Sequence, residues 1–551
     1  MSKPVASLGN FAPLRMTIRE NLRRPAFWLL LAVFALEFFL FDQFGARRHT
    51  SIYPRWNDQI QYLSESYTGY EFAHTHGFFP GLWQALTNRS AQGTLHDFYA
   101  VIVFTLVGPS RSAALAINML ALIAWQAALF AAMLRVRRPA PLAFAVAMLP
   151  LALAGPWQNI PGSAYDFRLD HLAMCSLGIT AAAALLTDGF RARRASLTFG
   201  LAAGLTLLTR FLTGTYFILI LIGLLAWTLR GEERKIRTRN VLLAALVAAV
   251  VAGPVLWLNF DTVREYYWIG HYVGPESAIR NSHMGLGRSL AFVGSELVQR
   301  HLGIFILVLG GAGAACLALL RFGERQPVNR DPFVIGAIFL IAPAFVLTLH
   351  QQKSEVVISA LAPGAVTLIA ALWLFVSRHA STKAVARFAT EIAIIAIVFF
   401  TQKQIPPAFA PGQLDEFRQV NTLADHIFTR SQAAHLPETR VAVDYVTDCL
   451  DAQVVRVICY ERHRVWLPFN MTLPTGIAAP TEEEVFARLA LSDFVFLTEE
   501  APAGGFPFDL KLAALRPKLR AWCEANLRIA ERFTLFGRRM VLYQRREIPL
   551  P

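Results

Sequence analysis

Charged residues are scarce in this chain of 551 residues. Asp, Glu, Lys and Arg together make up 16% of it, whereas 55% is hydrophobic. Soluble globular domains are usually roughly 45–50% apolar and about 25% charged. The apolar residues here also come in long blocks, and the mean hydropathy is +0.42. The composition therefore argues against an ordinary soluble protein and indicates a membrane protein.

Acidic residues are the rarer charge: 38 Asp and Glu stand against 52 Lys and Arg, a formal net charge of +14. In a soluble protein such a surplus would indicate a nucleic-acid partner. Here the basic residues lie mostly in short loops beside apolar blocks, a pattern that orients membrane proteins. We therefore expect no nucleic-acid partner.

Cysteine is also scarce, with five in the chain and no two in a CxxC spacing. This spacing argues against a thiolate zinc site. Cys449 and Cys459 are ten residues apart near the C-terminus. If that region lies outside the cytoplasm, their spacing permits a disulfide but does not require one.

Long apolar segments recur along the first 400 residues, and a transmembrane helix needs about 20 such residues in a row. The first segment follows a basic N-terminus without a small-residue cleavage site, which indicates a retained signal anchor. The sequence predicts a polytopic α-helical membrane protein with about eleven transmembrane helices. Their approximate ranges are 26–44, 111–134, 139–156, 168–187, 196–209, 211–229, 240–258, 302–320, 332–349, 356–376 and 387–402.

Basic clusters predict the orientation of these helices. They lie in the N-terminal tail and near residues 135–138, 191–194, 230–239, 321–330 and 378–387. All fall on one side if eleven helices are threaded in order, so we predict a cytoplasmic N-terminus. Arg47 and Arg48 go against this pattern. The prediction places four segments outside the cytoplasm, namely 45–110, 157–170, 259–301 and 350–355.

Residues 196–229 have basic residues at both ends, so they must cross the membrane an even number of times. Two short helices with a break near residues 210–214 fit this requirement best. A charge at the centre of a transmembrane helix costs roughly 2.5–3.5 kcal/mol on insertion scales. Arg210, beside the break, is therefore expected to face a protein-lined or wet cavity.

The hydropathy falls after a proline-rich joint at 405–412. We predict a transmembrane domain over 1–404 and a small extracytoplasmic α/β domain over 405–551. Within the second domain, the pattern predicts helices near 413–433, 481–491 and 512–527, and strands near 439–445, 493–498 and 539–544.

The first long external segment carries two candidate motifs. YPRWNDQIQYL (53–63) contains Asp58 and, one turn later, Tyr62. A carboxylate just outside the membrane is suited to act as a general base or to hold a cation, although a solvated loop acid is the alternative. HTHGFFPGLW (74–83) places His74 and His76 before aromatic residues, which suits a sugar or phosphate, and solvated turn histidines are the alternative. The same segment is long enough for amphipathic helices on the membrane surface, with 81–86 and 95–107 as candidates.

Two further clusters fall in short external segments. SAYDFRLDHLAM (163–174) holds Asp166, Arg168 and Asp170 at the mouth of a predicted helix. The two acids are four residues apart, so on a helix they would share a face, with helix capping as the alternative. HQQKSE (350–355) offers His350 and Lys353 as cations for a lipid phosphate, with an ordinary polar turn as the alternative.

The order of these features resembles the C-type glycosyltransferase (GT-C) superfamily, and most of all its bacterial inner-membrane branch. That branch includes lipid A aminoarabinose transferases, Rgt-type sugar transferases and protein O-mannosyltransferases. The resemblance covers residues 26–400 and departs from the family in two places. Asn57-Asp58-Gln59 carries one carboxylate where two are common, and Phe79-Pro80-Gly81 replaces a double proline. The motifs that carry it are PRWNDQIQY (54–62), HTHGFFPGLW (74–83), LVGPSRSAALAINML (106–120), FRLDHLAM (167–174), GLTLLTR (204–210, with Arg210 where Lys is usual) and HQQKSEVVISALAPG (350–364).

The resemblance implies a glycosyltransferase of the bacterial inner membrane that takes its sugar from a polyprenyl-phosphate carrier. Asp58 would be the base that activates the acceptor, with inversion at the anomeric carbon, and Asp170 would assist it. Arg210, His350 and Lys353 would hold the departing phosphate. The resemblance also implies that no metal cofactor is required. Further substrate contacts are expected from Tyr62, His74, His76, Asp166 and Arg168.

Two other classes of function remain open from sequence. A polytopic transporter or lipid-linked-sugar flippase would also use a broken helix such as the one expected within 196–229. A non-catalytic assembly protein that binds polysaccharide through 405–551 is the third reading. The sugar, the acceptor (glycan, lipid or protein) and the oligomeric state are not determined by the sequence.

Overall fold

Helices dominate the structure up to residue 403, and the strands of a small sheet follow from residue 441. The computed structural model describes residues 25–49, 57–135, 140–158, 161–230, 233–274, 277, 281–323, 330–405, 413–436, 438–443, 452–466, 469–470, 481–499, 510–535 and 538–548. This is the predicted class, a helical membrane protein with a C-terminal α/β region.

Eight helical segments among the described residues are long and apolar enough to cross a membrane. They are Pro25–Arg48, Arg111–Arg135, Leu169–Leu186, Arg234–Leu258, Leu286–Leu319, Asp331–Leu349, Val356–Ser377 and Thr382–Lys403. Helices also stand at the other three predicted positions, but they are shorter: α7 with η2 (Ala140–Met148 and Leu149–Ala152), α9 (Arg193–Thr209) and α10 (Thr213–Leu229). Eleven crossings therefore remain a prediction.

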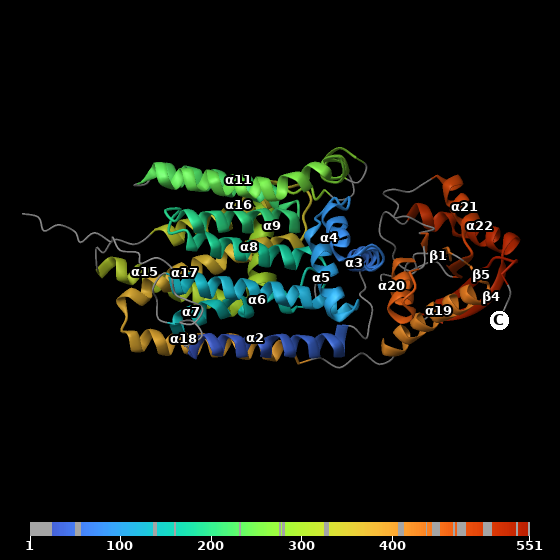
Figure 1. Cartoon of the computed structure of the whole chain (residues 1–551), viewed down its shortest axis with the longest axis horizontal. Coiled ribbons are helices and arrows are strands. Elements are labelled where there is room, and N and C mark those ends of the chain that lie inside the picture. Colours follow the sequence, from blue (N-terminus) through green and yellow to red (C-terminus); the bar gives the residue numbers. More distant parts are fainter. Residues whose placement is uncertain are drawn as a thin grey trace, which may run out of the picture.

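The long helices run side by side along the length of the molecule (Figure 1). Helix α11 (Arg234–Leu258) forms one side, and α2 (Pro25–Phe44) and α18 (Thr382–Lys403) form the other. Helix α8 (Leu169–Leu186) lies at the centre of the bundle. Of its most apolar stretch, 83% of the residues are buried, compared with 28% for α11. It packs on α6 (Arg111–Arg135), α9 and α17 (Ala362–His379). Outer helices of this kind present their apolar side chains to lipid.

The segments between helices gather at two opposite ends of the bundle. At one end, Arg191 pairs with Glu233 at 2.8 Å and with Asp331 at 3.0 Å, so three segments predicted to be cytoplasmic meet there. The segments predicted to be external meet at the other end, beside the C-terminal region (Figure 1). Which end faces the cytoplasm stays a prediction.

The predicted break within 196–229 is confirmed. Helix α9 ends at Thr209 and α10 begins at Thr213, so Arg210 stands between two helices of 17 residues each. At 1.5 Å per residue, each helix is about 25 Å long. The break therefore lies near one end of the bundle and not at its middle.

Three helices fill most of the first long segment, namely α3 (Asn57–His76), α4 (Phe78–Thr87) and α5 (Leu95–Val107). The last two cover the predicted amphipathic candidates. Sequence reasoning missed helix α3, because polar residues predominate along this stretch of the sequence. Asp58 consequently lies in the first turn of a helix.

The C-terminal region holds a five-stranded sheet in the order β2-β1-β3-β5-β4. The strands are β1 (Val441–Val443), β2 (Phe469–Asn470), β3 (Phe494–Thr498), β4 (Arg528–Leu535) and β5 (Arg538–Gln544), and the helices are α19 (Gln413–Ala433), α20 (Ala452–His463), α21 (Glu482–Leu491) and α22 (Leu510–Asn526). Every predicted element of this region is present. Sequence reasoning missed β2, β4 and α20, and β4 is hard to see because Arg528, Glu531 and Arg532 give it a charged first half without strict alternation.

The C-terminal region contacts helix α3. Tyr67 donates to Glu461 at 2.7 Å, and Ser64 donates to Gln453 at 3.2 Å. Cys459 is buried in α20, while Cys449 and residues 406–412 of the predicted joint at 405–412 lie outside the described residues. The domain boundary and the disulfide therefore stay predictions.

Candidate functional site

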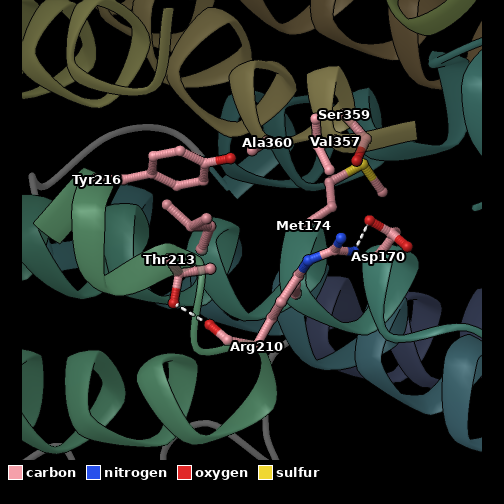
Figure 2. Close-up of a pocket in the computed structure, with 10 residues that line it drawn as sticks. Asp170, Met174, Arg210, Thr213, Tyr216, Val357, Ser359 and Ala360 are labelled. Carbon is pink, nitrogen blue, oxygen red and sulfur yellow. Dashed lines mark hydrogen bonds and ion pairs between the residues drawn. The ribbon is translucent and has the colours of Figure 1, made fainter. Parts of the chain in front are cut away.

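Two carboxylate–guanidinium pairs lie at the end of the bundle that faces the C-terminal region. The inner pair is Asp170 with Arg210, whose side chains are 8% and 15% exposed. Asp170 lies in the first turn of α8, where the helix dipole favours an acid. Arg210 has extended backbone between α9 and α10, so the break aims its side chain back toward α8. Figure 2 shows the two side chains meeting.

The inner pair borders a small pocket (Figure 2). Helix α8 contributes Met174 and Leu177, α10 contributes Tyr216, and the 3₁₀ helix η6 (Val356–Leu361) contributes Ser359. One end of the pocket therefore carries an ion pair, and the rest is mostly apolar with three hydroxyl groups, those of Thr213, Tyr216 and Ser359.

The outer pair is Asp58 with Arg168, whose Oδ2 and Nη1 are 3.3 Å apart. The guanidinium is buried, and its Nε lies 2.9 Å from Oδ2 of Asp166. Asp166 also accepts hydrogen bonds from Gln59 at 2.9 Å and from the Gly162 N–H at 2.6 Å. Burial raises the pKa of Asp166, while the Arg168 guanidinium and these hydrogen bonds oppose that rise. Asp166 and Arg168 thus form a buried support beneath Asp58.

The expectation that Asp166 and Asp170 share one helix face is wrong. Helix α8 begins at Leu169, so Asp166 precedes it and its side chain turns to Arg168. Asp170 turns instead to Arg210. The two acids therefore belong to different ion pairs.

Gly162 and Tyr62 connect the two pairs. The Gly162 N–H binds Asp166, and a Cβ at Gly162 would lie 3.3 Å from the Cβ of Asp170. Tyr62 lies one turn after Asp58 on α3. Burial raises the pKa of Tyr62, Arg210 lowers it and Asp58 raises it. The phenol therefore lies within electrostatic range of one member of each pair. The structure thus brings Asp58, Asp170 and Arg210, from separate segments, to the same end of the bundle.

The turn after α16 (Asp331–Leu349) has a different geometry from the one expected. Lys353 Nζ donates to the carbonyls of Leu347, Thr348 and His350 at 3.0, 2.9 and 2.6 Å. These are carbonyls that a helix end leaves unpaired, so the lysine caps α16. Burial lowers the pKa of Lys353.

His350 is also held by the protein. Its Nδ1 lies 3.0 Å from the carbonyl of Gln352, and its ring lies edge-on to Tyr272 with centroids 5.4 Å apart. Burial lowers the pKa of His350, which favours the neutral ring over the cation expected from the sequence. A neutral imidazole still donates or accepts a hydrogen bond.

His74 and His76 lie at the far end of α3, and both are exposed. They are sixteen and eighteen residues from Asp58 on one helix, which corresponds to about 24–27 Å. The His76 ring stacks on Phe72 with centroids 4.1 Å apart. The structure therefore does not bring these histidines to the two ion pairs.

Sequence reasoning missed two groups of residues at the site. Tyr267, in the π-helical segment η4 (Arg264–Val273), hydrogen-bonds Arg210. Gln92 accepts a hydrogen bond from Tyr62 and donates one to Tyr266 at 3.2 Å. The dense aromatic run in REYYWIGHYV was a usable signal for the tyrosines, whereas nothing in the sequence distinguishes Gln92. Among the described residues, no group of three or more His, Cys, Asp or Glu is placed to hold a metal ion.

Comparison with solved structures identifies the fold. ArnT from Cupriavidus metallidurans in the apo state superimposes with a TM-score of 0.57 at 16% identity, over 94% of this chain and 97% of that one. The Archaeoglobus fulgidus oligosaccharyltransferase in complex with zinc and sulfate gives a TM-score of 0.50 at 12% identity, over 88% and 69%. Both are GT-C glycosyltransferases, so this chain has the GT-C fold. No protein-family model and no curated protein sequence matches it.

Proposed function

We propose that this chain is a membrane glycosyltransferase that moves a sugar from a polyprenyl-phosphate carrier to an acceptor outside the cytoplasm. The observation that carries the proposal is the convergence of the two ion pairs at one end of a GT-C fold. One pair presents an accessible carboxylate. The other places a guanidinium beside a largely apolar pocket.

Asp58 is the proposed base. Its side chain is 55% exposed, while the Arg168 that holds it is 7% exposed, so the carboxylate is fixed and still open to an acceptor. It would take the proton from an acceptor hydroxyl or amine as that group attacks the anomeric carbon. The new bond forms as the bond from the anomeric carbon to phosphate breaks, and the configuration inverts. The phosphate leaves with the bonding electron pair.

Arg210 is the proposed group that stabilises the departing phosphate. A guanidinium fixed in advance by Asp170 and Tyr267 meets the growing negative charge without having to reorganise. Asp170 would thus act by orienting Arg210. The apolar wall around Met174 and Leu177 would accept the first part of the lipid chain.

His350 and Lys353 have a narrower role in this proposal than the sequence predicted. The Lys353 ammonium is used by three backbone carbonyls, so it would support the turn and add positive charge near the site. His350 would offer a neutral ring. For Asp166 and Arg168 we propose support of Asp58 in place of direct substrate contact.

The proposed setting is the bacterial inner membrane, with the N-terminus cytoplasmic and the site outside. The acceptor would be a cell-envelope glycan, a lipid or a protein. The donor carries the reactive phosphate, so the proposal includes no cofactor.

The test uses the purified full-length protein in lipid vesicles with a panel of labelled polyprenyl-phosphate sugars. We expect sugar transfer to an envelope-lipid or glycan extract and release of polyprenyl phosphate in equal amounts. Movement of the labelled lipid across the vesicle membrane without its consumption would instead identify a flippase, which the broken α9–α10 segment also suits. That result would overturn the proposal.

A further inference from the structure

The break that presents Arg210 is held by a short segment from a distant part of the chain, residues 90–94. The Phe211 N–H donates to the Gln92 carbonyl at 2.7 Å, and the Thr94 N–H donates to the Leu208 carbonyl at 3.0 Å. A broken helix leaves backbone groups without helical partners, and these must be paired when they are buried. Segment 90–94 pairs with the break on both sides of Arg210.

Gly93 allows this close approach. A Cβ at Gly93 would lie 2.2 Å from the Thr209 carbonyl oxygen and 3.1 Å from that of Leu208. Real Cβ atoms do not approach backbone this closely, so any other residue would push the segment away from the break. The position of Arg210 therefore depends on a glycine in another part of the chain.

The side chain of Gln92 connects the same segment to two tyrosines. Its Oε1 accepts a hydrogen bond from Tyr62, one turn after Asp58, and its Nε2 donates to Tyr266 at 3.2 Å. Tyr266 directly precedes Tyr267, which hydrogen-bonds Arg210. One residue thus touches α3, η4 and the α9–α10 break.

We propose that Gln92 is a positioning residue that sets the distance between the Asp58 carboxylate and the Arg210 guanidinium. The inference rests on the proposed function, because the distance matters for transfer from a phosphate. Attack requires the acceptor, the anomeric carbon and the phosphate in line, and a misplacement of about 1 Å can lower a rate roughly 100-fold. A glutamine that is hydrogen-bonded to Tyr62 on α3 and to Tyr266 in η4 resists that misplacement.

The test is a set of variants measured for transfer. Gln92→Ala is expected to lower kcat roughly 10- to 100-fold while the KM for the donor changes less than about twofold, because alignment is lost and ground-state binding is kept. Tyr62→Phe and Tyr266→Phe are expected to be non-additive, since either change breaks the same bridge. In the Gln92→Ala background, neither change should lower kcat further. A Tyr62→Phe variant that still lowers kcat there would show that Tyr62 acts directly on substrate, and would overturn the proposal.

Two further variants separate this role from general damage. Gly93→Ala, which forces the segment off the break, is expected to reproduce the fall in kcat. Gln61→Ala is the matched control, since Gln61 lies beside Tyr62 on α3, donates to Glu65 and is exposed, and it should leave kcat unchanged. An equal fall in kcat in Gln61→Ala and Gln92→Ala would overturn the proposal.

Hydrogen exchange supplies a measurement that needs no substrate. Gln92→Ala is expected to speed amide exchange in residues 208–213 and 264–273, but Gln61→Ala is not. Unchanged exchange in both segments would contradict the bridge. A wild-type protein without transfer to any acceptor would overturn the proposed function and, with it, the positioning role. The exchange result would still decide whether Gln92 bridges the two sides.

Discussion

The outer and inner ion pairs contain the same two chemical groups but expose opposite partners. In the outer pair, Arg168 is buried and Asp58 is 55% exposed. In the inner pair, Asp170 is the more buried member, at 8%, and Arg210 lines the pocket at 15%. The buried member fixes the geometry, and the other is left to meet a ligand. In the proposed function, the outer pair transfers the proton and the inner pair binds the phosphate.

The largest expected effect is on the outer pair. Asp58→Asn removes the proposed base, and transfer should fall by about 10²–10⁴-fold, the usual contribution of general base catalysis. The unfolding temperature should not change, because the carboxylate is half exposed. Asp415→Asn is the control, since Asp415 is an exposed acid paired with Arg418 at 2.8 Å and lies far along the chain. Transfer by Asp58→Asn at the rate of the control would contradict the assignment.

The next largest effect is on the stability of the fold, and it tests whether buried Arg168 is what holds the outer pair in place. Arg168→Met leaves the buried Asp166 without its guanidinium, so the free energy of unfolding should fall by about 3–5 kcal/mol. Arg418→Met, in an exposed pair, should cost about 1 kcal/mol or less. Thermal unfolding in detergent measures both variants. Equal shifts would mean that the buried network does not hold Asp58 in place.

A smaller effect should distinguish the inner pair. Arg210→Lys keeps a positive charge but loses the planar fork that binds carboxylate and phosphate. The kcat should fall about tenfold, with a smaller rise in the KM for the donor, because the charge that grows on the departing phosphate loses one charge-assisted hydrogen bond. Steady-state transfer kinetics with increasing donor measure this change. A kcat equal to that of the wild type would contradict the role of Arg210 at the departing phosphate.

The smallest expected effect concerns Asp97, a buried acid outside the two ion pairs whose partner is a hydroxyl group and not a guanidinium. Asp97 in α5 is buried and accepts from Ser66 at 2.7 Å, and burial raises its pKa, with Glu65 adding to the rise. The folded state therefore holds a proton that the unfolded state releases. Stability should fall as the pH rises from the ordinary pKa of 3.8 to the raised one. Asp97→Asn should flatten this dependence, as measured by unfolding temperature between pH 5 and about 8. An unchanged slope would show that Asp97 is ionised in the fold.

Sequence reasoning recovered the parts of the site that membrane physics constrains. Long apolar runs located the helices, and basic residues at both ends of 196–229 required a break near residues 210–214. Basic loops then gathered Asp58, Asp170 and Arg210 on one predicted side. Each of these inferences uses a large energetic penalty that any membrane protein must avoid, which is why the sequence alone reveals it.

The failures concern contacts that depend on tertiary geometry. His74 and His76 were expected near Asp58, but α3 continues without a break through both residues and carries them away. Lys353 was expected to be free for phosphate, and the sequence does not show that its chain folds back onto three carbonyls. Gln92 gives no local signal, because its role arises where three distant segments meet.

The most direct test of the account is the binding of polyprenyl phosphate, the product of the proposed reaction, to the purified protein. Arg210→Met removes a charge-assisted hydrogen bond, which is worth about 1.5–3 kcal/mol. We therefore expect this variant to bind polyprenyl phosphate roughly 10- to 100-fold more weakly. Asp58→Asn should bind as tightly as the wild type, because the outer pair acts on the acceptor. Wild-type affinity in Arg210→Met, or an equal loss in both variants, would contradict the division of roles between the two pairs.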